Sequence, residues 1–339
     1  MSDPSSRLNI ALAMPQDVAR RVFPARLLER LEPGLNLLST EPLQEFDSPR
    51  SRSLLARADI LITGWGCPQL DETVLNAAPN LRYILHAAGS AKHHVGQACW
   101  DRGLQVSTAA EANAVPVAEY TVAMILLANK NVLQLARIVH TLHSAVEPED
   151  YYPQLGNFRK RVGIIGASKI GRHVIRLLRS YDLEVVVADP YLDPEEAIEL
   201  GAELVGLDEL VASSDVVSLH APSLPSTRHM IDARQIARLR PGATFINTAR
   251  GELVDQDALL RRIEQGDLYA VLDVTTPWSL PTDSGFYVNP NVLLTPHVAG
   301  SLGSELERMA ASTVEEALRL SRGEALRFPL RAADLAFTA

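Results

Sequence analysis

The sequence predicts an α/β protein with two domains, each built on a parallel β-sheet with helices on both faces. Three observations lead to this prediction. The chain has 339 residues, which is enough for two ordinary domains. Short apolar runs alternate with segments of helical periodicity, an order that is typical of parallel sheets. One long helical segment interrupts the alternation, which then restarts.

The first 108 residues contain short apolar runs that predict strands. These runs cover residues 8–13, 35–38, 60–63, 82–86 and 104–107. Segments of helical periodicity lie between some of them, at residues 25–32, 48–58 and 71–78. Because a helical segment separates neighbouring strands, we expect crossover connections and parallel pairing.

A long helical pattern follows at residues 115–143, and its middle, YTVAMILLA, is apolar nearly all round. Such a helix is expected to be buried between two bodies. After a polar and aromatic connector, further strands are predicted at residues 161–165, 184–188, 216–219, 244–247, 270–274 and 292–294. A final helix is predicted at residues 303–322.

This order predicts one discontinuous domain, residues 1–108 with 297–339, and one continuous domain, residues 109–296. Two chain crossings between the domains would form a hinge. A cleft between two domains is a common place for a small ligand, so we expect the ligand site there.

Charge and cysteine content narrow the class of protein. The net charge of −9 argues against general binding to nucleic acids or to acidic membranes, although a local arginine can still bind a small anion. Cys67 and Cys99 are too few for a disulfide framework, so free thiols are expected. The first residues lack a basic segment before their apolar run, and the apolar stretch 114–128 contains Pro116 and Glu119. We expect a soluble, cytoplasmic protein.

The stretch RVGIIGASKIGRHVIRLL begins in a predicted strand and opens a helix, with Gly166, Ser168 and Gly171 at the spacing of a dinucleotide-binding loop. In such a loop the first glycine makes the turn, the second lets the backbone approach a pyrophosphate, and the third lets helix and strand pack closely. Ser168 replaces the middle glycine, which it can do if its φ is negative. The alternative is a tight turn that binds no ligand.

Asp189 supports the ligand interpretation, because it ends the next predicted strand, eighteen residues after Gly171. A carboxylate there accepts hydrogen bonds from the adenosine ribose and repels a 2′-phosphate, so it selects NAD over NADP. The alternative for Asp189 alone is a helix cap.

Five motifs now coincide: GIIGASKIG, DVVSLHAPSLPSTRHMI, PGATFINTARGELVD, AVLDV and NVLLTPHVAGS. In order and spacing they resemble the D-isomer-specific 2-hydroxyacid dehydrogenase family, which includes phosphoglycerate and hydroxypyruvate dehydrogenases. The resemblance extends from about residue 60 to 323 and is most specific at 162–300. It implies a flavodoxin-like substrate-binding domain, a Rossmann NAD-binding domain and a homodimer.

The resemblance also implies roles for single residues. Arg250 looks like the arginine that binds the carboxylate and carbonyl oxygen of a 2-oxo acid, and His297 looks like the general acid/base. Asp273 looks like the partner of the nicotinamide amide, and the turn Ala88, Gly89 and Ser90 resembles a carboxylate-binding turn. Further positions resemble cofactor contacts: Lys169, Ile170, Pro222, Thr227, Thr248, Ala249 and Gly300. We expect no metal, because hydride transfer needs none.

One position departs from the family pattern. The acid that pairs with the histidine usually lies five residues after the aspartate of LDV, and that position is Trp278 here. The position three after the aspartate, sometimes acidic, is Thr276, and the first acid in the loop is Asp283. Trp278 could hold the imidazole by stacking or shape the substrate pocket.

Two functions of different class remain open at this stage. The first is an NAD-dependent oxidoreductase that transfers a hydride between nicotinamide and C2 of a 2-oxo or 2-hydroxy acid. The second is an NAD(H)-binding regulatory or scaffolding protein with little or no turnover. An enzyme of the same fold acting on another anion, such as phosphite, is a third possibility. Arg250 and His297 favour an enzyme, whereas Trp278 favours the regulatory protein.

Overall fold

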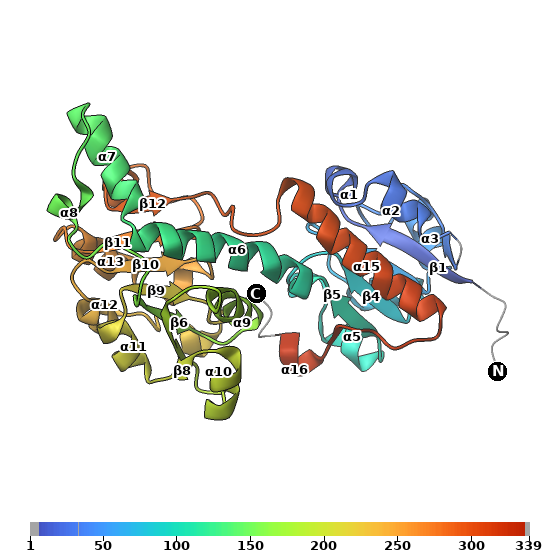
Figure 1. The fold of residues 1–339 in the computed structure, drawn as a ribbon. Helices are drawn as coiled ribbons and strands as arrows, with labels where there is room; N and C mark the ends of the chain where they lie inside the picture. The colour runs from blue at the N-terminus through green and yellow to red at the C-terminus, as the bar shows by residue number, and fades with distance from the viewer. Residues whose placement is uncertain (1–6, 33, 336–339) are drawn as a thin grey trace. The chain divides into compact units, whose positions relative to one another are not determined.

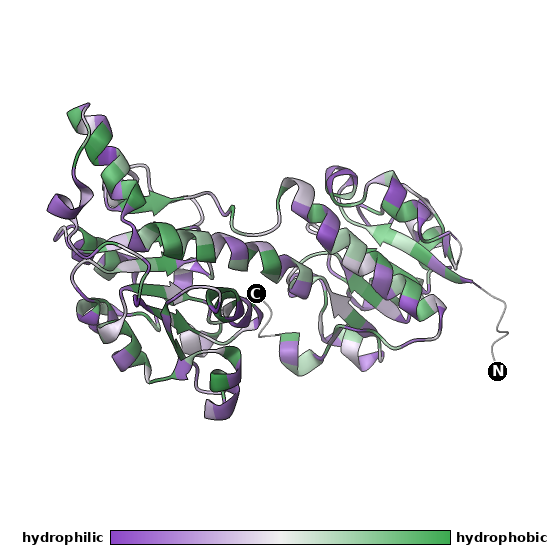
Figure 2. Ribbon diagram, viewed as in Figure 1, coloured by the Kyte–Doolittle hydropathy of each residue, from purple (hydrophilic) through white to green (hydrophobic). Residues whose placement is uncertain are grey.

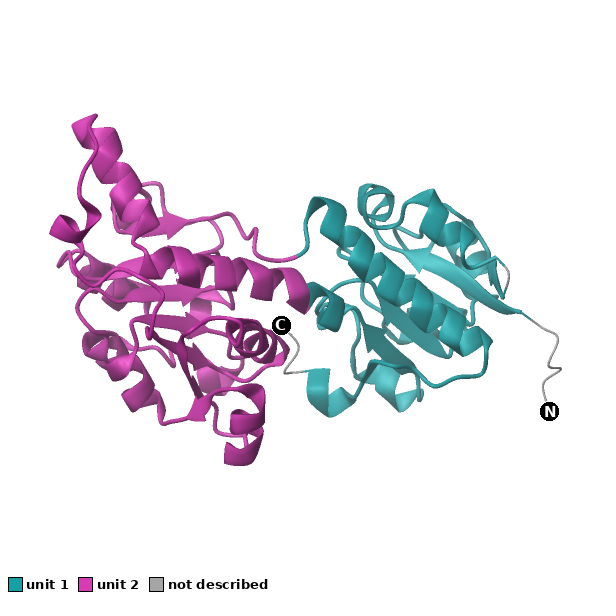
Figure 3. Cartoon of the chain, in the orientation of Figure 1, with its two compact units in different colours: residues 1–113, 301–339 teal, residues 114–300 magenta. Residues whose placement is uncertain are grey.

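The computed structural model describes residues 7–32 and 34–335. The chain forms two compact units (Figure 3). Unit 1 contains residues 1–113 and 301–339, and unit 2 contains residues 114–300. Figure 2 shows that the strands of both sheets are largely hydrophobic, whereas many helices carry a polar side.

Unit 1 is built on a six-stranded sheet with the order β13-β5-β4-β3-β1-β2 (Figure 1). Its parallel strands are β1 (Leu8–Ala13), β2 (Leu35–Leu37), β3 (Ile60–Thr63), β4 (Tyr83–His86) and β5 (Gln105–Thr108). The edge strand β13 (Pro329–Leu330) pairs antiparallel with β5, so the expectation of a wholly parallel sheet is wrong for this edge. Two residues are too short a run for the sequence pattern to indicate a strand.

Helices cover both faces of this sheet, because strand residues alternate between its two sides. One face packs against α1 (Gln16–Val22), α2 (Ala25–Glu29) and α15 (Leu306–Ser321). The other face packs against α3 (Pro49–Leu55), α4 (Glu72–Ala77) and α5 (Gln97–Asp101). The chain does not stop at the predicted final helix, since β13 and α16 (Ala332–Leu335) follow it.

Unit 2 is built on a parallel sheet of seven strands with the order β12-β11-β10-β9-β6-β7-β8. The strands are β6 (Arg161–Ile165), β7 (Glu184–Ala188), β8 (Glu203–Leu204), β9 (Val216–Leu219), β10 (Thr244–Asn247), β11 (Tyr269–Leu272) and β12 (Val292–Leu294). The chain order reverses between β6 and β9, and ligands bind at such switch points beyond the carboxyl ends of the strands.

The helices of unit 2 lie on both faces of this sheet. Helices α9 (Lys169–Leu178) and α10 (Pro194–Leu200) pack with part of α6 on one face. Helices α11 (Leu207–Ser213), α12 (Ala233–Arg238), α13 (Gln256–Ile263) and α14 (Gly285–Val288) pack on the other. Short elements complete the chain: α8 (Pro148–Tyr151) and the 3₁₀ turns η1 (Pro225–Thr227), η2 (Gly251–Leu253) and η3 (Gly303–Glu305).

The long helix predicted at residues 115–143 is in fact two helices, α6 (Ala110–Asn129) and α7 (Val132–Leu142), bent by 56°. The break falls at Asn131, which has a φ of 49°, a left-handed conformation that asparagine tolerates better than most residues. In the middle of α6 only Thr121, Val122 and Ile125 are buried, while Ala123 and Leu127 are exposed, so this helix is buried on one side and not all round as expected. Helix α7 contains no buried residue. Within the described ranges, no single helix is long and apolar enough to cross a membrane; α6 and α7 reach that length only as a bent pair.

Candidate active site

The functional residues expected in unit 2 follow the carboxyl ends of neighbouring strands. The phosphate loop follows β6, Asp189 follows β7, Pro222 and Thr227 follow β9, Thr248 to Arg250 follow β10, Asp273 follows β11, and His297 follows β12. Parallel strands bring these segments to one edge of the sheet. Segments that are more than a hundred residues apart in sequence thereby share one edge.

The loop predicted to bind phosphate makes a tight turn in which two glycines have no room for a side chain. Gly166 has a φ of 93°, and a Cβ there would lie 2.7 Å from the backbone nitrogen of Ala221. A Cβ on Gly171 would overlap the carbonyl oxygen of Gly166. Ser168 has a φ of −65°, so it fits where a glycine is usual, and its hydroxyl accepts a hydrogen bond from the amide of Gly171 at 3.4 Å. Ser168 is therefore the N-cap of α9, whose first turn contains the expected contacts Lys169 and Ile170.

Asp189 contacts the same loop. Its carboxylate accepts hydrogen bonds from the amide of Ala167 at 2.7 Å and from the amide of Tyr191 at 2.8 Å. The alternative in which Asp189 caps the next helix is wrong, because Asp193 is the N-cap of α10. Each carboxylate oxygen accepts two hydrogen bonds, so Asp189 retains acceptor capacity for ribose hydroxyls.

The loops after β9 and β10 are held by their own hydrogen bonds. Thr227 donates to the carbonyl of Pro222 at 2.7 Å, which fixes the turn between them. Thr248 is buried, and its hydroxyl lies 3.3 Å from that of Thr121 on α6. Ala249 is buried as well, and its amide donates to Asn247 at 3.0 Å. Hydrogen bonds within the domain therefore hold these expected cofactor contacts in place.

Arg250 directly follows Ala249 in the chain and is partly buried. Asn247, at the end of β10, donates to the carbonyl of Arg250 at 2.9 Å. The guanidinium donates to the carbonyl of Ala249 at 2.6 Å, its one hydrogen bond within the described residues. A guanidinium has five N–H groups, so most remain for a ligand. Burial lowers the pKa of Arg250, while nearby Glu252 opposes this, and the side chain stays cationic at neutral pH.

The segment that carries His297 is held by Asp273, which is 2 % exposed. The Asp273 carboxylate accepts hydrogen bonds from the Thr295 hydroxyl at 2.7 Å, the Val298 amide at 2.7 Å and the Ala299 amide at 2.9 Å. The backbone amide of His297 also donates to the Asp273 carbonyl at 3.0 Å. Three of four lone pairs are used, so the carboxylate can accept one more bond, as its expected role toward a nicotinamide amide requires.

Trp278 lies against His297, with ring centroids 5.0 Å apart and ring planes at 39°. Thr275 donates to the carbonyls of Pro277 at 2.9 Å and Trp278 at 3.2 Å, which holds the loop beneath the indole. A cavity of about 540 Å³ opens beside the two rings. Its lining includes Thr275, Phe286 and Tyr287 besides Trp278 and His297.

The electrostatics of His297 follow from these neighbours. Burial lowers its pKa below the ordinary value, the Asp273 carboxylate opposes that shift, and the Arg250 guanidinium adds to it. The acid partner was expected in the loop after Asp273, but the carboxylate that raises the pKa of His297 is that of Asp273 itself. Asp283, the first acid in the loop, is exposed and is not among the groups that shift this pKa.

The turn expected to bind a carboxylate, Ala88 to Ser90, lies in unit 1 directly after β4. Ala88 is buried, and its carbonyl accepts from the amide of Ala109 at 3.1 Å. A buried cluster lies close to this turn in the chain: the Thr63 hydroxyl lies 2.9 Å from His86 Nδ1 and 3.0 Å from His94 Nε2. No local pattern indicates it, because the three residues come from separate segments.

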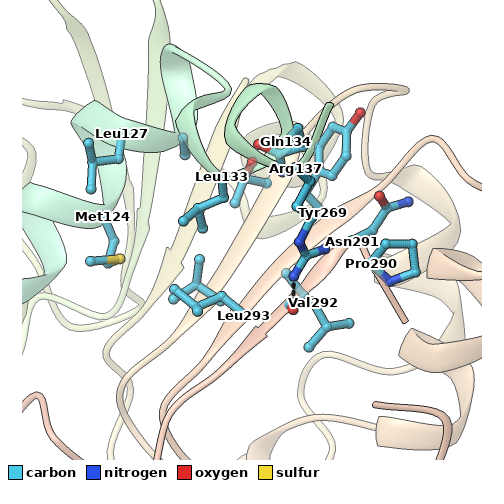
Figure 4. A pocket seen from close by; sticks show the side chains of 14 residues that line it. Met124, Leu127, Leu133, Gln134, Arg137, Tyr269, Pro290, Asn291, Val292 and Leu293 are labelled. Carbon is cyan, nitrogen blue, oxygen red and sulfur yellow. Dashed lines mark hydrogen bonds between the residues drawn. The ribbon is translucent and has the colours of Figure 1, made fainter. Parts of the chain in front are cut away.

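Unit 2 also contains a small cavity away from these residues. A cavity of about 20 Å³ lies between α6, α7 and strands β11 and β12, with Arg137 bonded to the carbonyl of Val292 at 3.4 Å (Figure 4). That volume suits one water molecule. Among the residues that the structure describes, no group of three or more His, Cys, Asp or Glu side chains is placed to hold a metal ion.

Comparison with known proteins defines the class of this chain. Residues 122–299 match the family model described as "D-isomer specific 2-hydroxyacid dehydrogenase, NAD binding domain". The chain is 33 % identical over 281 residues to D-3-phosphoglycerate dehydrogenase of Mycobacterium leprae, a match that covers 81 % of this chain and 52 % of that protein. The chain therefore belongs to the D-isomer-specific 2-hydroxyacid dehydrogenase family and contains its NAD-binding domain.

Relatives of similar length also match. The chain is 29 % identical to glyoxylate reductase of Korarchaeum cryptofilum, over 91 % of this chain and 94 % of that protein. It is 27 % identical to D-lactate dehydrogenase of Aquifex aeolicus, solved with NAD and lactic acid, with a TM-score of 0.67 over 93 % and 96 % of the two chains. The chain spans about half the length of the phosphoglycerate dehydrogenases that it matches.

The position of Asp189 leads to a prediction about cofactor choice. We expect NADH to bind at least about 10-fold more tightly than NADPH, because a carboxylate beside the ribose repels a 2′-phosphate. Asp189→Ser should narrow that ratio. Fluorescence titration of both cofactors measures it, with Asp193→Ser, at the cap of the next helix, as the control. Equal affinities in the wild type would refute the assignment of Asp189.

Proposed function

We propose that the chain is an NAD-dependent oxidoreductase that interconverts a 2-oxo acid and a 2-hydroxy acid. The observation that carries the proposal is the arrangement in unit 2 of a partly buried arginine with free N–H groups and a histidine of lowered pKa, at the edge of the sheet that holds the phosphate loop. The family membership and the relatives named as dehydrogenases and reductases support it.

The residues present fit NAD. The phosphate loop and the first turn of α9 would hold the pyrophosphate, and Asp189 the ribose hydroxyls. Thr248, Ala249, Pro222, Thr227, Gly300 and the spare lone pair of Asp273 would complete the contacts. When bound, the nicotinamide supplies or accepts the hydride.

Arg250 would bind the substrate. Its planar guanidinium can donate to the carboxylate and to the carbonyl oxygen at once, which orients the carbonyl carbon and withdraws electrons from it. The turn Ala88 to Ser90, in unit 1, remains predicted to bind a carboxylate through its backbone amides. These contacts select a small anion with an adjacent carbonyl group.

His297 would transfer the proton. In reduction, its imidazolium donates a proton to the carbonyl oxygen as the hydroxyl group forms. In oxidation, the neutral imidazole removes the proton from the hydroxyl group. Trp278 would hold the imidazole by ring contact where the family pattern places an acid, and would shape one wall of the substrate pocket.

The second candidate, a regulatory protein that binds NAD(H) without turnover, is less well supported. It accounts for Trp278 at the acid position. It does not account for Arg250 with most of its donors free, or for the three hydrogen bonds that hold the His297 segment. A screen of 2-oxo acids with NADH, measured as loss of absorbance, separates the two functions.

Replacement of Arg250 tests the substrate site. Arg250→Lys should raise KM for the active 2-oxo acid by about 100-fold, close to 3 kcal/mol, because an ammonium cannot make the paired hydrogen bonds. The affinity for NADH should stay within twofold. Arg240→Lys, at an arginine paired with Asp215, is the control. A near-normal KM in Arg250→Lys would mean that the carboxylate is bound elsewhere.

The pH dependence tests His297 and Trp278 together. Reduction needs protonated His297, so its kcat/KM should fall as pH rises through a pKa that lies below the ordinary histidine value. Oxidation needs the neutral ring and should persist to correspondingly acidic pH. Trp278→Glu should move both profiles toward alkaline pH by about one unit, since a carboxylate near an imidazolium stabilises it.

Trp278→Gln is the matched control for that measurement, because it removes the indole without adding a charge. If the wild-type reduction rate falls only above the ordinary pKa of histidine and Trp278→Glu leaves the profile unmoved, another group serves His297. The assignment of Trp278 would then be wrong.

We also propose that the chain forms a homodimer through α7. This helix contains no buried residue, and it exposes Val132, Val139 and Leu142. An apolar helix face of this kind is typical of a contact with another protein surface. The double variant Val139→Lys/Leu142→Lys should halve the mass measured by light scattering after gel filtration. Thr141→Lys, at an exposed polar position of the same helix, should leave the mass unchanged. A wild-type monomer would contradict the proposal.

A further inference from the structure

Two hydroxyl groups next to the His297 segment contact neither the substrate nor the cofactor in the function proposed above. Tyr120 lies on α6 and Thr295 directly after β12, and their hydroxyl oxygens are 3.1 Å apart. The Thr295 hydroxyl also lies 2.7 Å from Asp273 Oδ1. Both side chains are partly buried, so solvent competes only weakly for these bonds.

The direction of this chain of hydrogen bonds is fixed by chemistry. An ionised carboxylate only accepts, so the single proton of the Thr295 hydroxyl points to Asp273. The Thr295 oxygen is then an acceptor toward Tyr120, and Tyr120 must be the donor. Both O–H dipoles therefore point their positive ends toward Asp273.

Asp273 connects these hydrogen bonds to His297. The same oxygen, Oδ1, accepts from Thr295 and from the amide of Val298, the residue after His297. His297 itself has a φ of 56°, a left-handed conformation that costs a non-glycine residue roughly 1 kcal/mol and must be maintained by its surroundings. A shift of Oδ1 would move the backbone that places the imidazole.

We propose that Tyr120 and Thr295 are positioning residues for His297, which orient the Asp273 carboxylate and withdraw part of its negative charge through consecutive O–H donors. The inference rests on the proposed role of His297. It assigns Tyr120 and Thr295 to the control of the proton-transfer group rather than to substrate or cofactor contact.

The charges around His297 determine the sign of the effect. Asp273 raises its pKa and Arg250 lowers it, and Arg137 lines the cavity that His297 also lines. The same carboxylate helps to raise the pKa of the Tyr120 hydroxyl. Loss of a donor to Asp273 leaves more negative charge to act on the imidazolium, so the pKa of His297 should rise. A role limited to packing would not raise it.

The test uses Tyr120→Phe and Thr295→Val, which remove the hydroxyl groups with little change in shape. Thr295→Val should raise the pKa of His297 by about 0.5 unit, and Tyr120→Phe should raise it by less. The alkaline limb of the reduction profile should move by the same amount, and kcat should fall about 3- to 10-fold in Thr295→Val. The affinity for NADH should stay within twofold of the wild type.

Two further variants and one double variant complete the design. Thr295→Ser keeps the donor and should retain the wild-type pH profile. Tyr269→Phe, at the start of β11, is the matched control for loss of a tyrosine hydroxyl. In Tyr120→Phe/Thr295→Val the pH shift should equal that of Thr295→Val alone, because Tyr120 acts through Thr295.

Titration of His297 by NMR in isotopically labelled protein measures the pKa without any turnover. Failure of the proposed enzymatic function is therefore distinguishable from failure of this inference. If Thr295→Val does not fold, Tyr120→Phe and Thr295→Ser still decide the question. An unmoved or lowered pKa in Tyr120→Phe, or additive shifts in the double variant, would overturn the assignment.

Discussion

The site in unit 2 depends on the hydrogen bonds that the Asp273 carboxylate accepts. Asp273 directly follows β11, is almost completely buried, and accepts hydrogen bonds from the Thr295 hydroxyl and the amides of Val298 and Ala299. These bonds keep His297 in a left-handed conformation that the backbone would otherwise leave. A buried charge needs such partners, so the stability of Asp273 and the placement of His297 are coupled.

The parallel sheet provides the second constraint. Because β6, β9, β10, β11 and β12 are neighbours in one register, the loops that follow them share one edge. The steric limits at Gly166 and Gly171 and the rigid turn at Asn247 are local consequences of that arrangement. A ligand at this edge meets preorganised amides and side chains, which lowers the entropic cost of binding and orientation.

Trp278 affects how His297 is protonated, because it stands where the family pattern has an acid. The indole contacts the imidazole and can orient it, but it cannot stabilise the imidazolium as strongly as a carboxylate. Asp273 supplies the negative charge that remains, and its strength at His297 depends on the donors that Asp273 binds. Burial and Arg250 lower the pKa of His297, and Asp273 raises it, so these three together determine its protonation state. Because Asp273 is the one carboxylate among the described residues that raises this pKa, its position has a larger effect than it would have beside a second carboxylate.

The sequence by itself predicted the α/β class and nearly all strands of both sheets, because periodicity is a local property, and its motifs marked Arg250, His297 and Asp189 as candidate site residues. It missed β8, β13 and the break at Asn131, since two-residue strands and a single left-handed residue leave no periodic signal. Only the tertiary structure decided that Asp189 contacts the phosphate loop, that Trp278 lies on His297, and that Tyr120 reaches Asp273 through Thr295. Those contacts join residues as far as 175 positions apart, and the packing of α6 and the strand order, not any local pattern, bring them together.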